Sequence, residues 1–189
     1  IDPTDDSKDL PKENMTATTG SQQSETGSEG PASNVLDGDA STIWHTVWAG
    51  TPIENHWLNL KLEKPATVSG FRLQQRTSGR NGIIKEAEIW VKTVGAEDYV
   101  KVADASFSGS GWQGLAFEPV ENVTDVKLVP TATLGDQANK FSSAAEVRVM
   151  GEFQDAVIEA DKSDLNAAIE YAKSQQAKDE YQYVVPVVK

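Results

Sequence analysis

The sequence predicts an all-β fold, an antiparallel β-sandwich that is followed by a short α-helical extension. Residues 57–62 alternate strictly between apolar and polar side chains, which is the period of a strand with one buried face. β-Branched and aromatic residues, which favour strands, are concentrated in residues 67–75, 87–91 and 123–129. Turn-forming residues separate these runs at the short spacing typical of a sandwich, namely residues 63–65, 78–82, 108–111 and Pro130.

The helical extension is predicted within residues 156–176. Its apolar residues recur at steps of three and four, the period of one helix face: Ile158, Leu165, Ala168, Ile169 and Ala172. Asp161 or Ser163 can cap its first turn. A single helix cannot bury its apolar stripe alone, so we expect it to dock on the sandwich or to pack against segments beyond this sequence.

Composition restricts the classes of partner. The 189 residues suffice for one main domain and a small additional element. The net charge of −12 opposes binding to nucleic acid, whose partners concentrate Lys and Arg. No apolar run reaches the ~20 residues that cross a bilayer, so we expect no membrane partner. The absence of Cys excludes disulfides and thiol chemistry, and it favours an extracellular protein, secreted or attached to the cell wall, of a Gram-positive bacterium.

We expect three regions along the chain. Residues 1–14 belong to a polar stretch and are interpreted as a linker or a cloning remnant. Residues 15–152 contain the strand-like runs and form the main domain, and residues 153–189 form the helical segment. The chain begins with Ile1 and stops at Lys189 in the middle of an apolar pattern, so we expect it to be a piece of a longer protein.

A short acidic run has the chemistry of a cation site. Asp37 and Asp39 flank Gly38, which permits a tight turn, and Thr42 adds a hydroxyl and a carbonyl oxygen. Such a set of oxygens suits a hard cation with ~6–8 ligands, and calcium is the expected occupant. The alternative interpretation is a polar surface turn. The run lacks the acidic positions and the nearby terminal Glu of an EF-hand loop, so we expect a structural ion.

Three segments, residues 34–45, 56–62 and 145–149, resemble the discoidin or coagulation-factor F5/8 type C family, and within it the family 32 carbohydrate-binding modules. The resemblance covers about residues 15–152 and implies a jelly-roll sandwich of the galactose-binding-domain type. It also implies the calcium ligands Asn34 and Ala145 through their main chains, with Asp37, Asp39, Thr42 and Glu146. Residues 161–186 are similar to the opening of a FIVAR-type helical module of Gram-positive surface proteins and glycosidases.

Sugar recognition requires an aromatic face for the apolar side of a pyranose ring and polar groups for its hydroxyls. The resemblance implies that a His, an Arg and an Asn grip the axial O4 of galactose, with aromatic residues beside them. The candidate sugar-binding residues are His45, Trp48, Arg76, Asn81, Phe141 and Glu29. Loop packing is the alternative role for Trp48 and Phe141, whereas Trp44 is predicted to be core and His56 structural.

We therefore predict a non-catalytic, monomeric carbohydrate-binding module of a larger bacterial glycoside hydrolase. The expected partners are glycans, mucin-like and ending in galactose or N-acetylgalactosamine, or in N-acetylglucosamine. Catalysis by the chain itself is disfavoured, because Asp37 and Asp39 suit a cation better than the paired acids of a glycosidase. The alternatives are an adhesin domain for protein or lipid and a catalytic glycosidase fragment.

Overall fold

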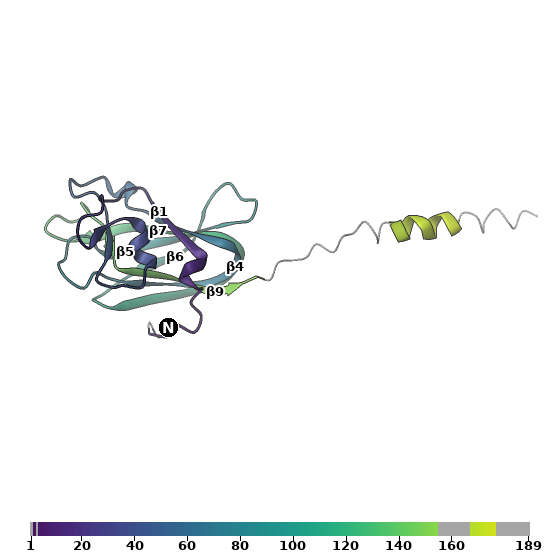
Figure 1. Ribbon diagram of the computed structural model, residues 1–189, viewed down its shortest axis with the longest axis horizontal. Helices are drawn as coiled ribbons and strands as arrows, with labels where there is room; N and C mark the ends of the chain where they lie inside the picture. The colour runs from purple at the N-terminus through teal and green to yellow at the C-terminus, as the bar shows by residue number, and fades with distance from the viewer. Residues whose placement is uncertain (1, 3, 155–166, 177–189) are drawn as a thin grey trace, which may run out of the picture. The chain divides into compact units, whose positions relative to one another are not determined.

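The computed structural model describes residues 2, 4–154 and 167–176 of the chain (Figure 1). The chain divides into two units, residues 1–154 and 155–189. In the first unit, the described residues form nine strands: β1 (Met15–Thr19), β2 (Glu29–Gly30), β3 (Ile43–His45), β4 (Leu58–Gln74), β5 (Ile83–Thr93), β6 (Val100–Ser106), β7 (Trp112–Leu134), β8 (Ser143–Ala144) and β9 (Glu146–Phe153). Three short 3-10 turns join them: η1 (Lys12–Asn14), η2 (Ala32–Leu36) and η3 (Ile53–Asn55).

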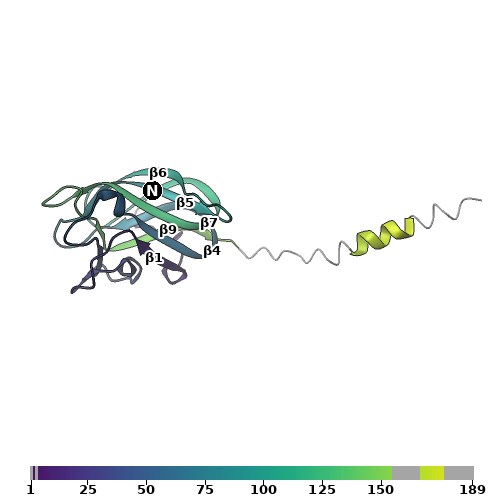
Figure 2. The same ribbon diagram turned by 90° about the horizontal axis from the view of Figure 1, so that it is seen from above.

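The strands form one curled sheet that folds over itself into a sandwich, as the sequence predicts (Figures 1 and 2). The order is β1-β4-β7-β5-β8-β3-β2, with β6 added to β5 and β9 added to β4. The long strands β4 and β7 take part in both layers, because β4 pairs β1 through its first residues and β9 through its last. All pairs are antiparallel except β2 with β3 and β5 with β8.

The core lies between the two layers and follows the alternation in the sequence. Leu58, Leu60 and Leu62 of β4 point inward and are at most 4% exposed, whereas Lys61 between them is exposed. The hydrophobic effect, about 25 cal/mol per Å² of apolar surface, favours this register over a one-residue slip, which would turn the apolar set to solvent. The largest fully buried side chain in the described residues is Trp44.

Two predicted turns are instead positions inside strands. Residues 63–65 lie in β4 at a register shift between Lys61 and Ala66, and Pro130 pairs with Ala87 beside a shift in the β5–β7 ladder. A bulge tolerates a proline because the ladder already lacks a regular hydrogen bond there. The expected turns at residues 78–82 and 108–111 are confirmed as connections between strands. The outer strand β6 has weak alternation and was not predicted from the sequence.

The expectation that residues 1–14 are a linker is wrong for residues 8–14. The amide of Leu10 donates to the carbonyl of Val149 at 2.8 Å, Leu10 is 3% exposed, and Asp9 forms a bridge with Met150. The one apolar anchor of this segment, Leu10, was too weak a signal to reveal that it lies along β9.

In the second unit, residues 167–176 are helical, within the predicted helix, and residues 156–166 of that prediction lie outside the described residues. The similarity to a FIVAR module stays a prediction. None of the described helical segments has the length and apolar character required to cross a membrane.

Candidate functional site

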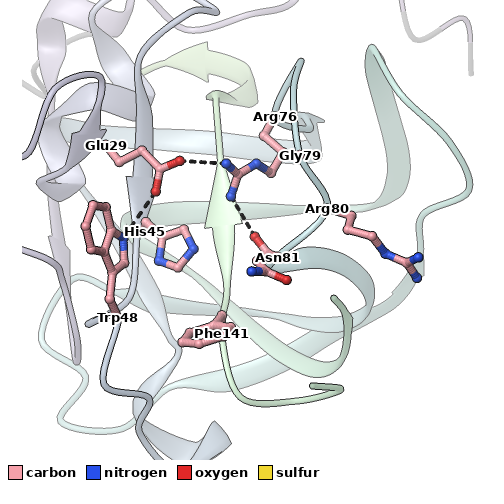
Figure 3. Close-up of a pocket in the computed structure, with 8 residues that line it drawn as sticks. All are labelled: Glu29, His45, Trp48, Arg76, Gly79, Arg80, Asn81 and Phe141. Carbon is pink, nitrogen blue, oxygen red and sulfur yellow. Dashed lines mark hydrogen bonds and ion pairs between the residues drawn. The ribbon is translucent and has the colours of Figure 1, made fainter. Parts of the chain in front are cut away.

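The six candidate sugar-binding side chains line one pocket of about 320 Å³, together with Gly79 and Arg80 (Figure 3). They come from separate parts of the chain: β2, β3, the segment after β3, the β4–β5 loop and the segment before β8. Its volume is at the lower end of the ~300–1,000 Å³ range of small-molecule sites. Gly79 and Arg80 were not predicted as pocket residues, although they lie in the turn signal at residues 78–82.

Two segments that carry pocket residues contact each other at Gly82. Gly82 has φ +87°, and its amide donates to the carbonyl of Leu134 at 2.9 Å while its carbonyl accepts from the amide of Ser143 at 2.8 Å. A Cβ at Gly82 would lie 2.7 Å from main-chain atoms of Ser142 and Ser143. Only glycine allows this approach together with a positive φ. The close approach holds the loop that carries Arg76 and Asn81 against the segment that carries Phe141.

Hydrogen bonds fix the amide of Asn81. Its Oδ1 accepts from the amide of Asp136 at 2.9 Å. Because that oxygen is engaged at the rim, the amide nitrogen is turned toward the pocket (Figure 3). Asn81 therefore presents a hydrogen-bond donor to a ligand.

Arg76 and Glu29 form the charged wall of the pocket. The Arg76 guanidinium donates from Nη2 to Glu29 Oε1 at 2.6 Å, from Nη1 to the Asn81 carbonyl at 2.8 Å and from Nε to the Ser78 carbonyl at 2.6 Å. Glu29 Oε2 accepts from the indole nitrogen of Trp48 at 3.2 Å (Figure 3). Glu29 thus connects the guanidinium to the aromatic ring, and both oxygens of its carboxylate already have a partner in the protein.

His45 is oriented in the pocket by a hydrogen bond from its ring to the main chain. Its Nδ1 lies 2.6 Å from the carbonyl of Thr46, which can only accept, so Nδ1 carries the hydrogen and Nε2 carries the lone pair. Burial lowers the pKa of His45, and the nearby Arg76 charge lowers it further, whereas the Thr46 and Asn81 main chains and the Glu29 carboxylate raise it. The ring of Phe141 packs beside it with centroids 5.4 Å apart and an interplanar angle of 50°.

The aromatic residues divide between core and pocket. Trp48 is 47% exposed, which leaves a ring face available, whereas Trp44 is fully buried and its indole nitrogen donates to the Ser21 carbonyl at 3.0 Å. The prediction of Trp44 as core is therefore confirmed. His56 is buried, with Nδ1 2.9 Å from the Ser142 hydroxyl and Nε2 3.0 Å from the Thr51 carbonyl, which gives it the structural role predicted for it.

The candidate calcium ligands gather where the loop after η2 meets the start of β9. Asp37 Oδ2 accepts from the Thr42 hydroxyl at 2.5 Å, and the main-chain carbonyl of Asp39 accepts from the same hydroxyl at 2.9 Å. The Asp39 carboxylate turns away to the amide and hydroxyl of Ser41. Asp39 therefore offers its carbonyl rather than its carboxylate toward Thr42.

Glu146 supplies the buried carboxylate of this cluster. It is 2% exposed, and its Oε1 is buried without a hydrogen-bond partner, whereas Oε2 accepts from Arg148 Nη1 at 2.6 Å. Burial raises the pKa of Glu146, and the neighbouring Asp37 carboxyl raises it further, while Arg148 and the Gly38 amide lower it. A buried carboxylate oxygen without a partner costs free energy, which a cation bound beside it would offset.

The chemistry of these residues fits calcium. Among the residues that the structure describes, no group of three or more His, Cys, Asp or Glu side chains could hold a metal by themselves. A cation here would therefore need hydroxyl and main-chain oxygens beside the carboxylates of Asp37 and Glu146. Oxygen-only sets of this mixed kind suit calcium. Ala145 directly precedes Glu146, and the Asn34 carbonyl accepts from the amide of Asp37 at 3.3 Å.

A jelly-roll sandwich that presents one small pocket of aromatic and polar side chains between its loops is a ligand-binding module. The family model of the F5/8 type C domain matches residues 16–147, and the chain belongs to this family.

Two curated relatives are bacterial enzymes. An A type blood N-acetyl-α-D-galactosamine deacetylase of Flavonifractor plautii is 38% identical over 147 residues, which are 74% of this chain and 18% of that protein. A sialidase of Micromonospora viridifaciens is 32% identical over 127 residues, 66% of this chain and 19% of that protein. The chain therefore spans less than a fifth of the length of these curated relatives.

Solved structures of isolated modules match over nearly their whole length. The module CpGH89CBM32-5 of Clostridium perfringens, in complex with GalNAc-β-1,3-galactose, is 31% identical with a TM-score of 0.67, over 76% of this chain and 99% of that one. The family 32 module of NanJ from C. perfringens, in complex with galactose, is 29% identical with a TM-score of 0.62, over 75% and 97%. The chain is thus a family 32 carbohydrate-binding module and not a catalytic domain.

Proposed function

We propose that this module binds a terminal galactose or N-acetylgalactosamine residue in the pocket of Figure 3. The observation that carries the proposal is that Glu29, His45, Trp48, Arg76, Asn81 and Phe141, from separate parts of the chain, line one pocket. The similar modules of C. perfringens were solved with GalNAc-β-1,3-galactose and with galactose, which supports the same class of ligand here.

Each group has a role that its geometry supports. The exposed ring of Trp48 offers a face to the apolar side of a pyranose. His45 Nε2 accepts from a sugar hydroxyl, while the Arg76 guanidinium and the Asn81 amide donate to sugar oxygens. Because Glu29 and main-chain carbonyls already hold Arg76 in place, little side-chain entropy remains to be lost on binding. We expect dissociation constants of ~0.1–1 mM, equivalent to about −5.5 to −4 kcal/mol.

Such weak binding becomes effective when the module is linked covalently to an enzyme. We propose that the module belongs to a larger extracellular glycoside hydrolase of a Gram-positive bacterium, and that it holds the enzyme on mucin-like host glycans as a monomer. A tether converts the second encounter into an intramolecular event and raises the effective concentration of enzyme at the glycan. The similarity to a blood-group deacetylase and a sialidase supports host glycans as the context.

A glycan array tests the sugar assignment. We expect signal on glycans that end in galactose or N-acetylgalactosamine, and loss of that signal in Trp48→Ala. Trp90→Ala is the matched control, because Trp90 is a partly exposed tryptophan of β5 that does not line the pocket. Signal restricted to N-acetylglucosamine, or an array that stays dark while the protein binds lipid or protein, contradicts the assignment.

We also propose that calcium binds between Asp37, the Asp39 carbonyl, Thr42 and Glu146, with main-chain oxygens of Asn34 and Ala145. The unpartnered Oε1 of Glu146 supports this site. The ion would join the loop after η2 to β9 and neutralise the buried carboxylate of Glu146 and the exposed carboxylate of Asp37, without touching the sugar pocket. Its removal by a chelator should lower the melting temperature, since a ligand of the native state stabilises by mass action.

A further inference from the structure

Residues 8–14 lie upstream of the family-matched residues and are nevertheless fastened to β9. The Leu10 amide donates to the Val149 carbonyl at 2.8 Å, and the Gly151 amide donates to the Lys8 carbonyl at 2.8 Å. These two bonds bracket Asp9, which forms its bridge with Met150. Residues 8–10 therefore pair with β9, the strand that begins with Glu146, through one antiparallel bridge.

The same segment reaches the other side of the proposed calcium site. The ammonium group of Lys12, at the start of η1, donates to the main-chain carbonyl of Asp37 at 2.5 Å. The next residue, Gly38, has φ +87°, and a Cβ there would lie 2.6 Å from the Lys12 nitrogen. Lys12 therefore packs directly on the turn that aims the Asp37 carboxylate.

A second path of side chains leads from the segment to Glu146. Asp9 Oδ2 accepts from Arg72 at 2.5 Å, and the Arg72 guanidinium lies 4.5 Å from the ring centre of Trp112. The other guanidinium near that ring, Arg148 at 5.4 Å, is the ion-pair partner of Glu146. The segment thus contacts the turn directly through Lys12 and is linked to the buried carboxylate only indirectly, through Arg72, the Trp112 ring and Arg148.

We infer that residues 8–14 are an N-terminal clasp and that Lys12 is a positioning residue for calcium, holding the turn at Asp37 in its ion-binding conformation. This inference rests on the proposed calcium site. Coupling between two binding events is reciprocal, so calcium in turn tightens the clasp on β9.

The opposite role for Lys12, a resident cation that competes with calcium, has less support. A competing ammonium would contact the carboxylates, whereas Lys12 contacts a main-chain carbonyl and forms no ion pair with a carboxylate among the described residues. The two roles also predict opposite changes in calcium affinity when Lys12 is replaced. Loss of a competing charge strengthens calcium binding, whereas loss of the hydrogen bond to the turn weakens it.

The test is a calcium titration by calorimetry on the full chain, with Lys12→Met against Lys8→Met. Both variants remove one positive charge, but Lys8 contributes only its main-chain carbonyl and its side chain is exposed. We expect Lys12→Met to weaken calcium binding about tenfold, the size of one charge-assisted hydrogen bond, and Lys8→Met to change it less than about twofold. Lys12→Arg, which keeps a donor, should restore most of the affinity.

Hydrogen exchange supplies an independent readout. Calcium should slow hydrogen exchange of the Leu10 and Gly151 amides in the wild type, and this added protection should disappear in Lys12→Met. Unchanged or tighter calcium binding by Lys12→Met overturns the clasp. A wild type that binds no calcium, with the same melting temperature in a chelator, overturns the metal site itself, and galactose binding by all variants shows that each is folded.

Discussion

Glu29→Gln is the substitution that best separates a positioned pocket from a collection of nearby side chains. The change keeps the size of the side chain but removes the charge that pairs Arg76 at 2.6 Å and accepts from the Trp48 indole at 3.2 Å. The Glu29 side chain is 22% exposed and that of Arg76 9%, so solvent screens the ion pair only in part.

The size of the expected loss in galactose affinity follows from these contacts. A hydrogen bond to a charged partner contributes about 1.5–3 kcal/mol, and glutamine keeps one acceptor oxygen, so we expect a loss near the lower end, about 1.5 kcal/mol. This corresponds to roughly tenfold weaker binding of galactose. The loss arises because Arg76 and Trp48 are no longer held in one arrangement before the sugar arrives.

Isothermal titration with galactose measures this loss. Glu97→Gln, an exposed glutamate in the β5–β6 connection, removes the same charge far along the chain from the pocket residues and is the matched control. Retention of wild-type affinity within about twofold by Glu29→Gln would refute the positioning role and leave the ion pair as a feature of the fold alone.

Three further predictions concern pH, a glycine and the ion. Burial lowers the pKa of His45 below its usual value of about 6.5, so galactose affinity should be constant above pH 6.5 and should fall as Nε2 becomes protonated at lower pH. A series of titrations from pH 7.5 downward measures the fall, and an affinity that stays constant while NMR shows His45 becoming protonated would exclude Nε2 as an acceptor. Because the pKa values of His45 and His56 are lowered, the two neutral rings contribute fully to the stability of the fold above pH 6.5, and this contribution is lost as the pH falls through their folded-state pKa values. The raised pKa of Glu146 changes stability in the opposite direction as the pH falls. Melting curves at different pH should therefore be compared with calcium bound. Gly82→Ala should lower the free energy of unfolding by roughly 2–4 kcal/mol, because it combines a positive φ with a clash against main-chain atoms. Gly95→Ala is the control: Gly95 has φ +75° but open space around it, so its loss in chemical unfolding should be only about 1–2 kcal/mol. Equal losses would mean that the loop contact at Gly82 contributes nothing to stability. A chelator should lower the melting temperature of the wild type more than that of Asp37→Ala, and equal responses would place the ion elsewhere.

The sandwich was predictable because it depends on short patterns, whereas the pocket residues were named through the resemblance to the family 32 modules. Alternation at residues 57–62 defines the buried face of β4 whatever its neighbours are. The pocket residues lie beside recognisable signals, such as the run that ends at His45 and the glycine turn after Arg76. Sequence reasoning could name these residues, but the way Glu29 joins Arg76 to Trp48 depends on the pairing of β2 with β3, which is not a local property.

The sequence predictions that differ from the structure also depend on non-local contacts. Proline at positions 65 and 130 predicts a turn locally, but register shifts in the ladders accommodate both inside long strands. Residues 8–14 have the composition of a linker, and their place in the fold comes from Asp9 and Leu10 meeting partners far along the chain. The Asp39 carboxylate accepts from Ser41 through a local hydrogen bond, and its role as a calcium ligand stays a prediction.

The central claim is that one pocket recognises a galactose-type sugar through His45, Arg76 and Asn81. Amide chemical-shift mapping on titration with galactose and with glucose, its epimer at C4, tests it most directly. We predict that galactose shifts the amides around these three residues and that glucose shifts them far less at the same concentration. Equal shifts by both sugars, or shifts confined to another face of the sandwich, would contradict the account.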